Sequence, residues 1–255
     1  EIYQCDWSSD VCSSDLSQQK LYDVYDDATQ VARQIPRYPK SYTRMPASPL
    51  IPRPLTLSEI SGPKDLAGLL HAGPLDLSRS AEGKRAVGQL IWVTGKVCDE
   101  DGSPIQGAVL EIWQANSAGK YIHQLDGTDA PLDPNFTGQG RLVTDEEGSY
   151  RFLTVKPGAY PVNDTGWWWR PPHIHFSILG MSWMDRYLTQ IFFPGEPLNK
   201  VDLLLNAAGD QEVKNRLIFE EDGMAMATKE LKVENTLGFR RDFVLRGHKR
   251  TPEMA

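Results

Sequence analysis

The chain has 255 residues, of which 40% are hydrophobic and 24% charged, so it is long enough and apolar enough to bury a core. Its formal net charge of −7 argues against a nucleic acid or an anionic membrane surface as a partner. No apolar run of the sequence reaches the roughly 20 residues needed to span a bilayer, and we expect a soluble, cytoplasmic protein.

The N-terminal stretch CDWSSDVCSSDL, residues 5–16, resembles a sequencing-library adapter translated in one reading frame. We therefore expect residues 1–16 to be non-native and leave them out of the fold prediction. Two of the three cysteines lie in this stretch. The third, Cys98, lies in a strand-like run, where a lone cysteine is typical of a small core residue. The sequence thus predicts neither a disulfide framework nor a thiolate metal site.

Residues 17–87 are predicted to form an extended N-terminal arm. The segment RQIPRYPKSYTRMPASPLIPRPLTLSEISGP within it is rich in proline, which interrupts helices and cannot donate a hydrogen bond to a sheet. A disordered tail is the alternative interpretation. Apolar residues spaced through the segment, among them Ile35, Tyr38 and Leu50, favour an arm that packs across another surface.

Residues 88–255 are predicted to form an all-β domain, an antiparallel β-sandwich. The stretches QLIWVTGKVCDEDGSPIQGAVLEIWQAN and RLVTDEEGSYRFLTVKPGAYP each have the pattern of a strand, a turn and a second strand. HIHFSILG, RYLTQIFFPG and RRDFVLRG add further strands. Strands separated by turn residues, with little helix between them, are typical of such a sandwich. The exception is a short C-terminal helix at DQEVKNRLIFEE (210–221), with Asp210 as its N-cap.

His173 and His175 lie in one of these strands, in the sequence HIH. Residues i and i+2 of a strand share a face, so the two imidazoles project side by side. Ile174 and Phe176 then point the other way, into apolar packing. Two imidazoles on a rigid strand form half of a metal site, although a pair of hydrogen-bonded structural histidines has the same pattern.

Two loop tyrosines are candidates to complete such a site. Tyr160 lies in the turn PGAYP just before the histidines, and Tyr121 lies in SAGKYIH. No cysteine, and no acidic residue closer than Asp164, lies near the histidines to form a His/Cys set or a facial triad. A phenol binds as phenolate only to a strong Lewis acid, so this set would suit a hard trivalent ion such as iron. Spacing alone leaves a packing role open for each tyrosine.

Several motifs follow one another along the chain: GKVCDEDGSPIQGAVLEIWQAN, GKYIH, APLDPNFTGQGRLVTDEEGSYRF, KPGAYP, RPPHIHF, LTQIFFPGEPL and DFVLRG. Together they resemble the intradiol ring-cleavage dioxygenases, and within that family the iron-bearing β subunits that act on protocatechuate. The resemblance runs from about residue 35 to about residue 250. The PLDPNF loop, the PGxYP turn and RPxHIHF are its most specific parts.

The resemblance implies a catalytic domain at residues 88–255 with a non-haem iron(III). The ligands that it implies are Tyr121, Tyr160, His173 and His175, in the family's spacing. It also implies cleavage of a catecholic substrate by O₂, with protocatechuate giving 3-carboxy-cis,cis-muconate. In the family the substrate displaces the tyrosine that matches Tyr160, which helps to accept a proton. A homologous α subunit without iron ligands is the implied partner, in a hetero-oligomer.

The resemblance further assigns Arg170 and Gln190 to positions that stabilise charge on the reacting substrate. A guanidinium beside a developing anion lowers the barrier electrostatically. Stacking of Arg170 on one of the tryptophans at 167–169 is a second role that is compatible with the first.

One position departs from the pattern, because Val162 stands where the protocatechuate enzymes usually carry tryptophan. A smaller residue changes the pocket wall, so another catechol is a possible substrate. Catechol and hydroxyquinol 1,2-dioxygenases have the same ligands, but they carry a helical N-terminal linker domain that the proline-rich residues 20–87 do not resemble. A non-catalytic transthyretin-like module is the alternative from another class, and it accounts for the strands but not for the tyrosines or RPPHIHF.

Overall fold

The computed structural model describes residues 35, 37, 38, 40–43, 76–162, 167–180, 186–223 and 235–245. The segment predicted to be non-native, 1–16, lies outside the described residues, and so does most of the predicted arm, 17–87. The domain boundaries therefore stay a prediction. Within the described ranges, no helix is long and apolar enough to cross a membrane.

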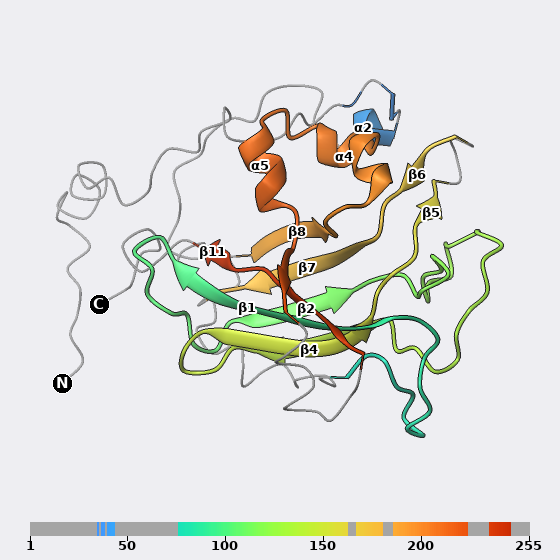
Figure 1. Ribbon diagram of the computed structural model, residues 1–255. Coiled ribbons are helices and arrows are strands. Elements are labelled where there is room, and N and C mark those ends of the chain that lie inside the picture. Colours follow the sequence, from blue (N-terminus) through green and yellow to red (C-terminus); the bar gives the residue numbers. More distant parts are fainter. Residues whose placement is uncertain are drawn as a thin grey trace, which may run out of the picture.

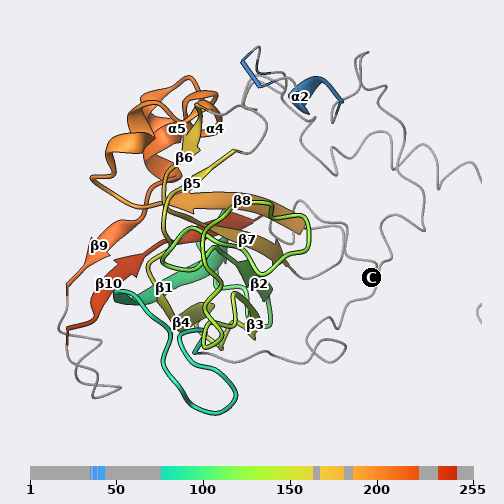
Figure 2. The ribbon, with the colours of Figure 1, turned by 90° about the vertical axis from the view of Figure 1, so that its right-hand side faces the viewer.

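Two β-sheets form the body of the structure (Figures 1 and 2). One has the order β3-β2-β7-β8, with β2 at Val109–Trp113, β3 at Gln139–Val143, β7 at His173–Leu179 and β8 at Arg186–Phe192. The other is centred on β1 (Leu90–Asp99), which pairs with β4 (Ser149–Val155), β10 (Leu237–Arg240) and β11 (Phe243–Leu245), while β9 (Glu220–Asp222) pairs with β10. A two-stranded sheet joins β5 (Tyr160–Pro161) to β6 (Trp169–Arg170). The predicted all-β architecture is confirmed.

Both predicted strand–turn–strand segments connect the two sheets instead of forming hairpins. β1 pairs with β4, and β2 pairs with β3, so each turn carries the chain from one sheet to the other. In the first turn Asp99 Oδ1 accepts hydrogen bonds from the backbone N–H groups of Asp101 and Ser103 at 3.0 and 2.8 Å. Gly102 adopts a φ of +82°, which favours glycine. The turn is where the sequence predicts it.

Side chains from both sheets meet in one hydrophobic core. Its fully buried members include Ile91, Val93, Val97 and Phe152 from one sheet and Leu110, Ile174, Phe176 and Ile178 from the other. The Phe176 ring centroid lies 5.1 Å from that of Phe243 and 6.2 Å from that of Phe152. Cys98 was predicted to be a core residue and is only half-buried, because its neighbour Val97 takes the inward position on β1.

Parallel pairing is one difference from the predicted antiparallel sandwich. β1 runs parallel to both β10 and β11, so its sheet is mixed. The strand predicted at 240–247 is divided between these two elements, because Arg241 N donates to Thr94 O and Asp242 Oδ1 accepts from Lys96 N, each at 2.9 Å. Gly95 allows this close crossing, since a Cβ there would lie 1.9 Å from the Arg241 carbonyl oxygen.

The predicted C-terminal helix begins where expected but ends early. Helix α5 spans Gln211–Arg216, and its N-cap Asp210 accepts hydrogen bonds from two backbone N–H groups of the first turn. The predicted end at residue 221 is wrong. The backbone of Phe192 bonds to Leu217 O at 2.8 Å and to Phe219 N at 2.9 Å, which draws the chain onto β8.

The remaining helical segments are short. They are α2 (Lys40–Thr43), the 3-10 helix η2 (Pro197–Lys200) and α4 (Leu203–Asn206). Figures 1 and 2 show α4 and α5 together on one side of the sandwich, next to β8 and the β5–β6 pair.

We predict that Phe176→Ala lowers the free energy of unfolding by about 3–5 kcal/mol, because it leaves a cavity between the sheets. Leu188→Ala is the control on the neighbouring strand β8. Its side chain is 61% exposed, and we expect a change within about 0.5 kcal/mol. Chemical denaturation measures both. Equal losses for the two variants would contradict the placement of Phe176 in the core.

Candidate metal centre

Strand β7 presents His173 and His175 on one face, as predicted. Their ring centroids lie 4.9 Å apart. Ile174 and Phe176 point to the other face and are fully buried in the core. Because β7 lies between β2 and β8, both of its edges are hydrogen-bonded, and the histidines stand on a rigid base.

Two loop tyrosines meet this histidine pair. The Tyr121 hydroxyl lies 3.1 Å from His175 Nε2, and the Tyr160 hydroxyl lies 3.3 Å from His173 Nε2. The two tyrosine rings meet edge to face, with centroids 5.3 Å apart. The four side chains that the resemblance assigns to a metal therefore converge at one point, although they come from two loops and a strand.

Two glycines allow the tyrosine loops to approach each other. A Cβ on Gly119 would lie 2.2 Å from Ala159 O, and one on Gly158 would lie 2.4 Å from Ser117 O. Gly119 also adopts a φ of +81°, in the left-handed region. The Gly158 N–H donates to Asn116 O at 2.9 Å, which joins the two loops directly. The distance between Tyr121 and Tyr160 thus depends on the absence of side chains at these positions.

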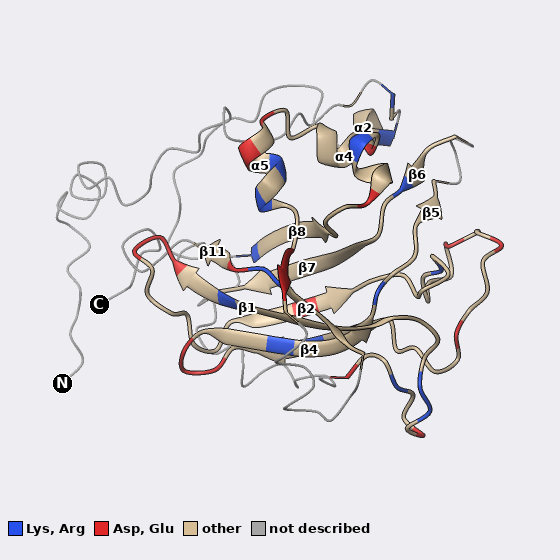
Figure 3. Cartoon of the chain, in the orientation of Figure 1, with Lys and Arg blue, Asp and Glu red and all other residues tan. Residues whose placement is uncertain are grey.

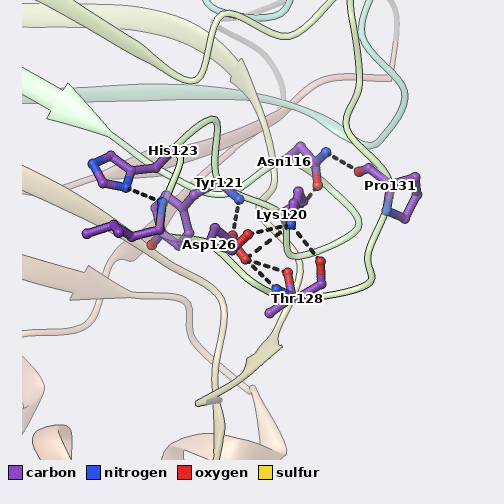
Figure 4. Close-up of polar contacts among 8 residues, drawn as sticks. Asn116, Lys120, Tyr121, His123, Asp126, Thr128 and Pro131 are labelled. Atoms are coloured by element: carbon purple, nitrogen blue, oxygen red, sulfur yellow. Dashed lines mark hydrogen bonds and ion pairs between the residues drawn. The ribbon is translucent and has the colours of Figure 1, made fainter. Parts of the chain in front are cut away.

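Asp126 holds the loop that carries Tyr121 (Figure 4). Its Oδ2 accepts from Tyr121 N at 2.8 Å, and its Oδ1 accepts from Thr128 N and Oγ1 at 2.9 and 2.6 Å. The Lys120 ammonium lies 3.3 Å from Oδ1 and donates to the backbone oxygens of Asp126 and Thr128. Burial opposes ionisation of Asp126, but these hydrogen bonds outweigh it and lower the pKa of the carboxyl group. A charged Asp126 therefore fixes the backbone at Tyr121.

The two histidines are oriented by groups behind them. His173 Nδ1 lies 2.7 Å from Pro171 O, and since a carbonyl only accepts, the ring proton is on Nδ1 and Nε2 offers its lone pair to the site. The His175 ring stacks on Trp113, with centroids 4.8 Å apart and planes 6° from parallel. Both Nε2 atoms consequently face the tyrosine hydroxyls.

The protonation states suit metal binding. Burial, with the nearby Arg170 charge, lowers the pKa of His173 well below its usual value and that of His175 to about 3, so both imidazoles are neutral at pH 7. Burial raises the pKa of Tyr121 and of Tyr160 above the usual value. The two phenols therefore ionise only beside a strong positive charge, which favours a hard, highly charged cation.

Donor chemistry narrows the kind of metal. In the part of the chain that the structure describes, no cluster of three or more His, Cys, Asp or Glu side chains is placed to hold an ion. A thiolate zinc site or a two-histidine, one-carboxylate site is thus not formed by these residues. The donor chemistry of two imidazoles and two phenols fits a ferric ion.

Arg170 and Gln190 lie beside these donors. Arg170 is opposite Tyr160 in the β5–β6 pair, and Gln190 is opposite His175 in the β7–β8 pair. Arg170 Nη2 donates to Gln190 Oε1 at 2.6 Å. The guanidinium carbon also lies 5.7 Å from the centre of the Trp168 ring, so the contact with a tryptophan considered for Arg170 is present.

A cavity of about 590 Å³ opens onto the site, a volume in the range of small-molecule pockets. Residues named above that line it are Trp113, Tyr121, Asp126, Thr128, Tyr160, Val162, Trp168, Arg170, His175 and Gln190. His173 is 1% exposed and lies behind this surface. A single aromatic ring entering the cavity would meet the hydroxyls of both tyrosines together with the Arg170 side chain.

Three supporting residues were not predicted: Trp113, Asp126 and Asp202. Asp202 is fully buried, and its Oδ2 lies 2.9 Å from Arg170 Nε. Its position before the apolar run LLL is an N-cap signal that the sequence does contain. Its pairing with Arg170 has no sequence signal, because it depends on how the segment after β8 folds back over β6.

The family model described as Dioxygenase matches residues 62–247, a span that includes all four tyrosine and histidine donors. The chain belongs to the intradiol dioxygenase family. The non-catalytic module considered from the sequence is not supported, because this is a family of ring-cleaving enzymes and its match covers the site.

Individual relatives agree with this family. The protocatechuate 3,4-dioxygenase beta chain of Burkholderia cepacia is 43% identical, over 85% of this chain and 90% of that relative. The hydroxyquinol 1,2-dioxygenase of Rhizobium sp. (strain MTP-10005) is 34% identical over 51% of this chain, which spans 45% of that enzyme. The solved hydroxyquinol 1,2-dioxygenase of Pseudomonas putida DLL-E4 is 23% identical, with a TM-score of 0.52 over 69% of this chain and 60% of that one, and shows the shared fold.

We predict that Gly158→Ala lowers the free energy of unfolding by about 1–3 kcal/mol, because the new methyl group pushes apart the two loops that carry the tyrosines. Gly223→Ala is the matched control, since a Cβ there meets no atom within 4 Å and neither glycine has a positive φ. Chemical denaturation of the two variants makes the comparison. Equal stability of the two variants would show that the loops accommodate a methyl group at position 158 without moving apart.

Proposed function

We propose that this chain is the iron-bearing subunit of a protocatechuate 3,4-dioxygenase. It would cleave 3,4-dihydroxybenzoate with O₂ between the two hydroxyl-bearing carbons, giving 3-carboxy-cis,cis-muconate. The observation that carries the proposal is the convergence of Tyr121, Tyr160, His173 and His175 beside a cavity that fits one aromatic ring.

The four donors would hold a ferric ion. The imidazoles are neutral, and the phenols lie within hydrogen-bond distance of them, so little rearrangement is needed to point four lone pairs at one centre. When bound there, ferric iron supplies the Lewis acidity that stabilises phenolates and a chelated catecholate, and makes the catecholate ring reactive toward O₂.

We expect Tyr160 to take a substrate proton. A catechol that binds as a dianion would give up two protons: one would go to the oxygen of Tyr160, if that residue is present as phenolate, and the other to hydroxide from the solvent, which becomes water. Tyr160 pairs with Arg170 in the two-residue β5–β6 ladder, and the Arg170 charge opposes the increase of its pKa by burial. Tyr121, held through Asp126, stays in place.

Arg170 and Gln190 would stabilise negative charge on the substrate. Arg170 is nearly fully buried, so its charge acts through a medium of low dielectric constant. Donors aimed at developing charge contribute about 100- to 1,000-fold each to the rate in well-studied enzymes. Gln190 orients the guanidinium by accepting from its Nη2.

Protocatechuate is proposed as the substrate because the protocatechuate relative matches nearly end to end, while the hydroxyquinol relative matches over about half of its length. Lys40 also lines the cavity, where its ammonium would meet a ring carboxylate. Val162 lines it as well and leaves more room than the tryptophan usual in such enzymes.

The cytoplasmic location stays a prediction.

The first test is the visible spectrum of the iron-loaded protein. We expect a tyrosinate-to-iron(III) band that shifts when protocatechuate is added without oxygen, and product formation in air that is faster with protocatechuate than with catechol or hydroxyquinol. A His173→Ala/His175→Ala double variant should lose the band. His123→Ala should keep it, since His123 lines the cavity outside the donor set. A protein that stays colourless and iron-free after ferric loading would refute the proposal.

The second test concerns the partner. The relative is named as a beta chain, and we propose that this chain assembles with a homologous α subunit that completes the active site. We expect low ring-cleavage activity from the chain alone and a large increase when an α chain from a similar enzyme is co-expressed. Size-exclusion chromatography should show both chains in one complex. Full activity in a complex of this chain alone would contradict the partner proposal.

A further inference from the structure

Asp202 lies at the start of α4, behind Arg170, and is fully buried. Its Oδ2 accepts from Arg170 Nε at 2.9 Å, and the two side chains are 0% and 6% exposed. In Figure 3 the basic part of β6 and the acidic residue that precedes α4 lie side by side. This is a buried ion pair at the edge of the candidate active site, formed by two segments distant in sequence.

Two hydrogen bonds of Arg170 fix the plane of its guanidinium. Nε is directed to Asp202, and Nη2 is directed to Gln190 Oε1 at 2.6 Å. A guanidinium is planar and rigid, so two directed hydrogen bonds leave it one orientation. Gln190 is neutral and paired with His175 across the ladder. Asp202 is therefore the group that neutralises the charge and sets the direction of the side chain.

Asp202 also positions a wall of the same cavity. Its Oδ1 accepts from Leu205 N at 2.8 Å, which caps α4. Leu204, the residue before Leu205, lines the cavity. The backbone of Asp202 is fixed in turn, since its N–H donates to Leu198 O at 2.9 Å and its carbonyl accepts from Asn206 Nδ2 at 2.8 Å. The Asp202 carboxylate thus fixes the position of the Arg170 guanidinium and also that of the helix that carries Leu204.

We propose that Asp202 is a positioning residue for the ring-cleavage reaction, acting through Arg170. The inference rests on the proposed function. Asp202 bonds to Arg170 Nε and is absent from the lining of the cavity, whereas Arg170 lines it. Without its charge, the Arg170 side chain is free to turn away from Gln190 and from the reacting substrate.

Asp202→Asn separates this role from capping, because asparagine caps helices as well as aspartate but carries no charge. We expect kcat for protocatechuate to fall by roughly tenfold to a hundredfold, since small misplacements of catalytic groups have effects of that order. KM should stay within about threefold, because Arg170 acts on charge that develops during the reaction. Asp202→Glu, which keeps the charge, should recover part of the lost kcat.

The matched control is Asp210→Asn. Asp210 caps α5 in the same way but is exposed, and no bond to the site is among its hydrogen bonds. It should match the wild type in kcat. A second comparison uses Arg170→Ala: adding Asp202→Asn to this variant should cause no further loss of kcat, because the group through which Asp202 acts is gone.

The possible results distinguish a failure of this inference from a failure of the proposed function. A wild-type kcat in Asp202→Asn, or a loss that adds in full to that of Arg170→Ala, overturns the inference. If Asp202→Asn does not fold, Asp202→Ser decides, because serine also caps helices but carries no charge: a lower kcat with KM retained supports positioning, and an unchanged kcat refutes it. If the wild type itself cleaves no catechol, the proposed function has failed instead. Thermal unfolding of the single and double variants then still tests whether Asp202 and Arg170 are coupled.

Discussion

The site depends on the two-residue alternation of strand β7. Ile174 and Phe176 are held in the core between the sheets, and this burial forces His173 and His175 onto the opposite face. A shift of one residue in register would bury the imidazoles in an apolar core and expose the two apolar side chains. The hydrophobic effect that folds the sandwich therefore also aims the two histidines, and the rest of the centre is assembled around them.

Burial then determines how the polar groups of the centre are balanced. His173 Nε2 accepts a hydrogen bond from Tyr160, the Tyr121 hydroxyl lies 3.1 Å from His175 Nε2, and the buried cation of the site, Arg170, is paired with Asp202. Buried charges are tolerated when they are paired and hydrogen-bonded, whereas an unpaired one is costly. The site without iron therefore contains no uncompensated charge. Under the proposed function, a ferric ion and a catecholate dianion would enter it together, and their opposite charges would compensate each other. The geometry and the electrostatics favour the same chemistry.

The sequence was most informative where local rules apply. Alternation placed His173 and His175 on one face, and the Asp210 cap marked the start of a helix, both as observed. It was less informative where segments distant in sequence pair with each other. The predicted helix ends early because the backbone of Phe192 bonds to Leu217 and Phe219. The parallel pairing of β1 with β10 and β11 was not predicted either. The tyrosines were candidates from the sequence, but spacing alone left their role open, and only the family resemblance assigned them to a metal. Asp202 was missed because its ion pair is purely tertiary.

The two tyrosines differ in how firmly the fold holds them, and this difference matters for a substrate that must replace one ligand. Tyr121 stands on a loop whose backbone is fixed by Asp126, with Lys120 and Thr128 bonded to the same carboxylate. Tyr160 belongs to a ladder of only two residue pairs. Displacing Tyr121 would break a buried, charged network, whereas displacing Tyr160 moves one ring away from His173 toward the cavity it already lines. Under the proposed function, the support of the backbone, more than the chemistry of the two identical phenols, would make Tyr160 the ligand able to leave and Tyr121 the one that stays.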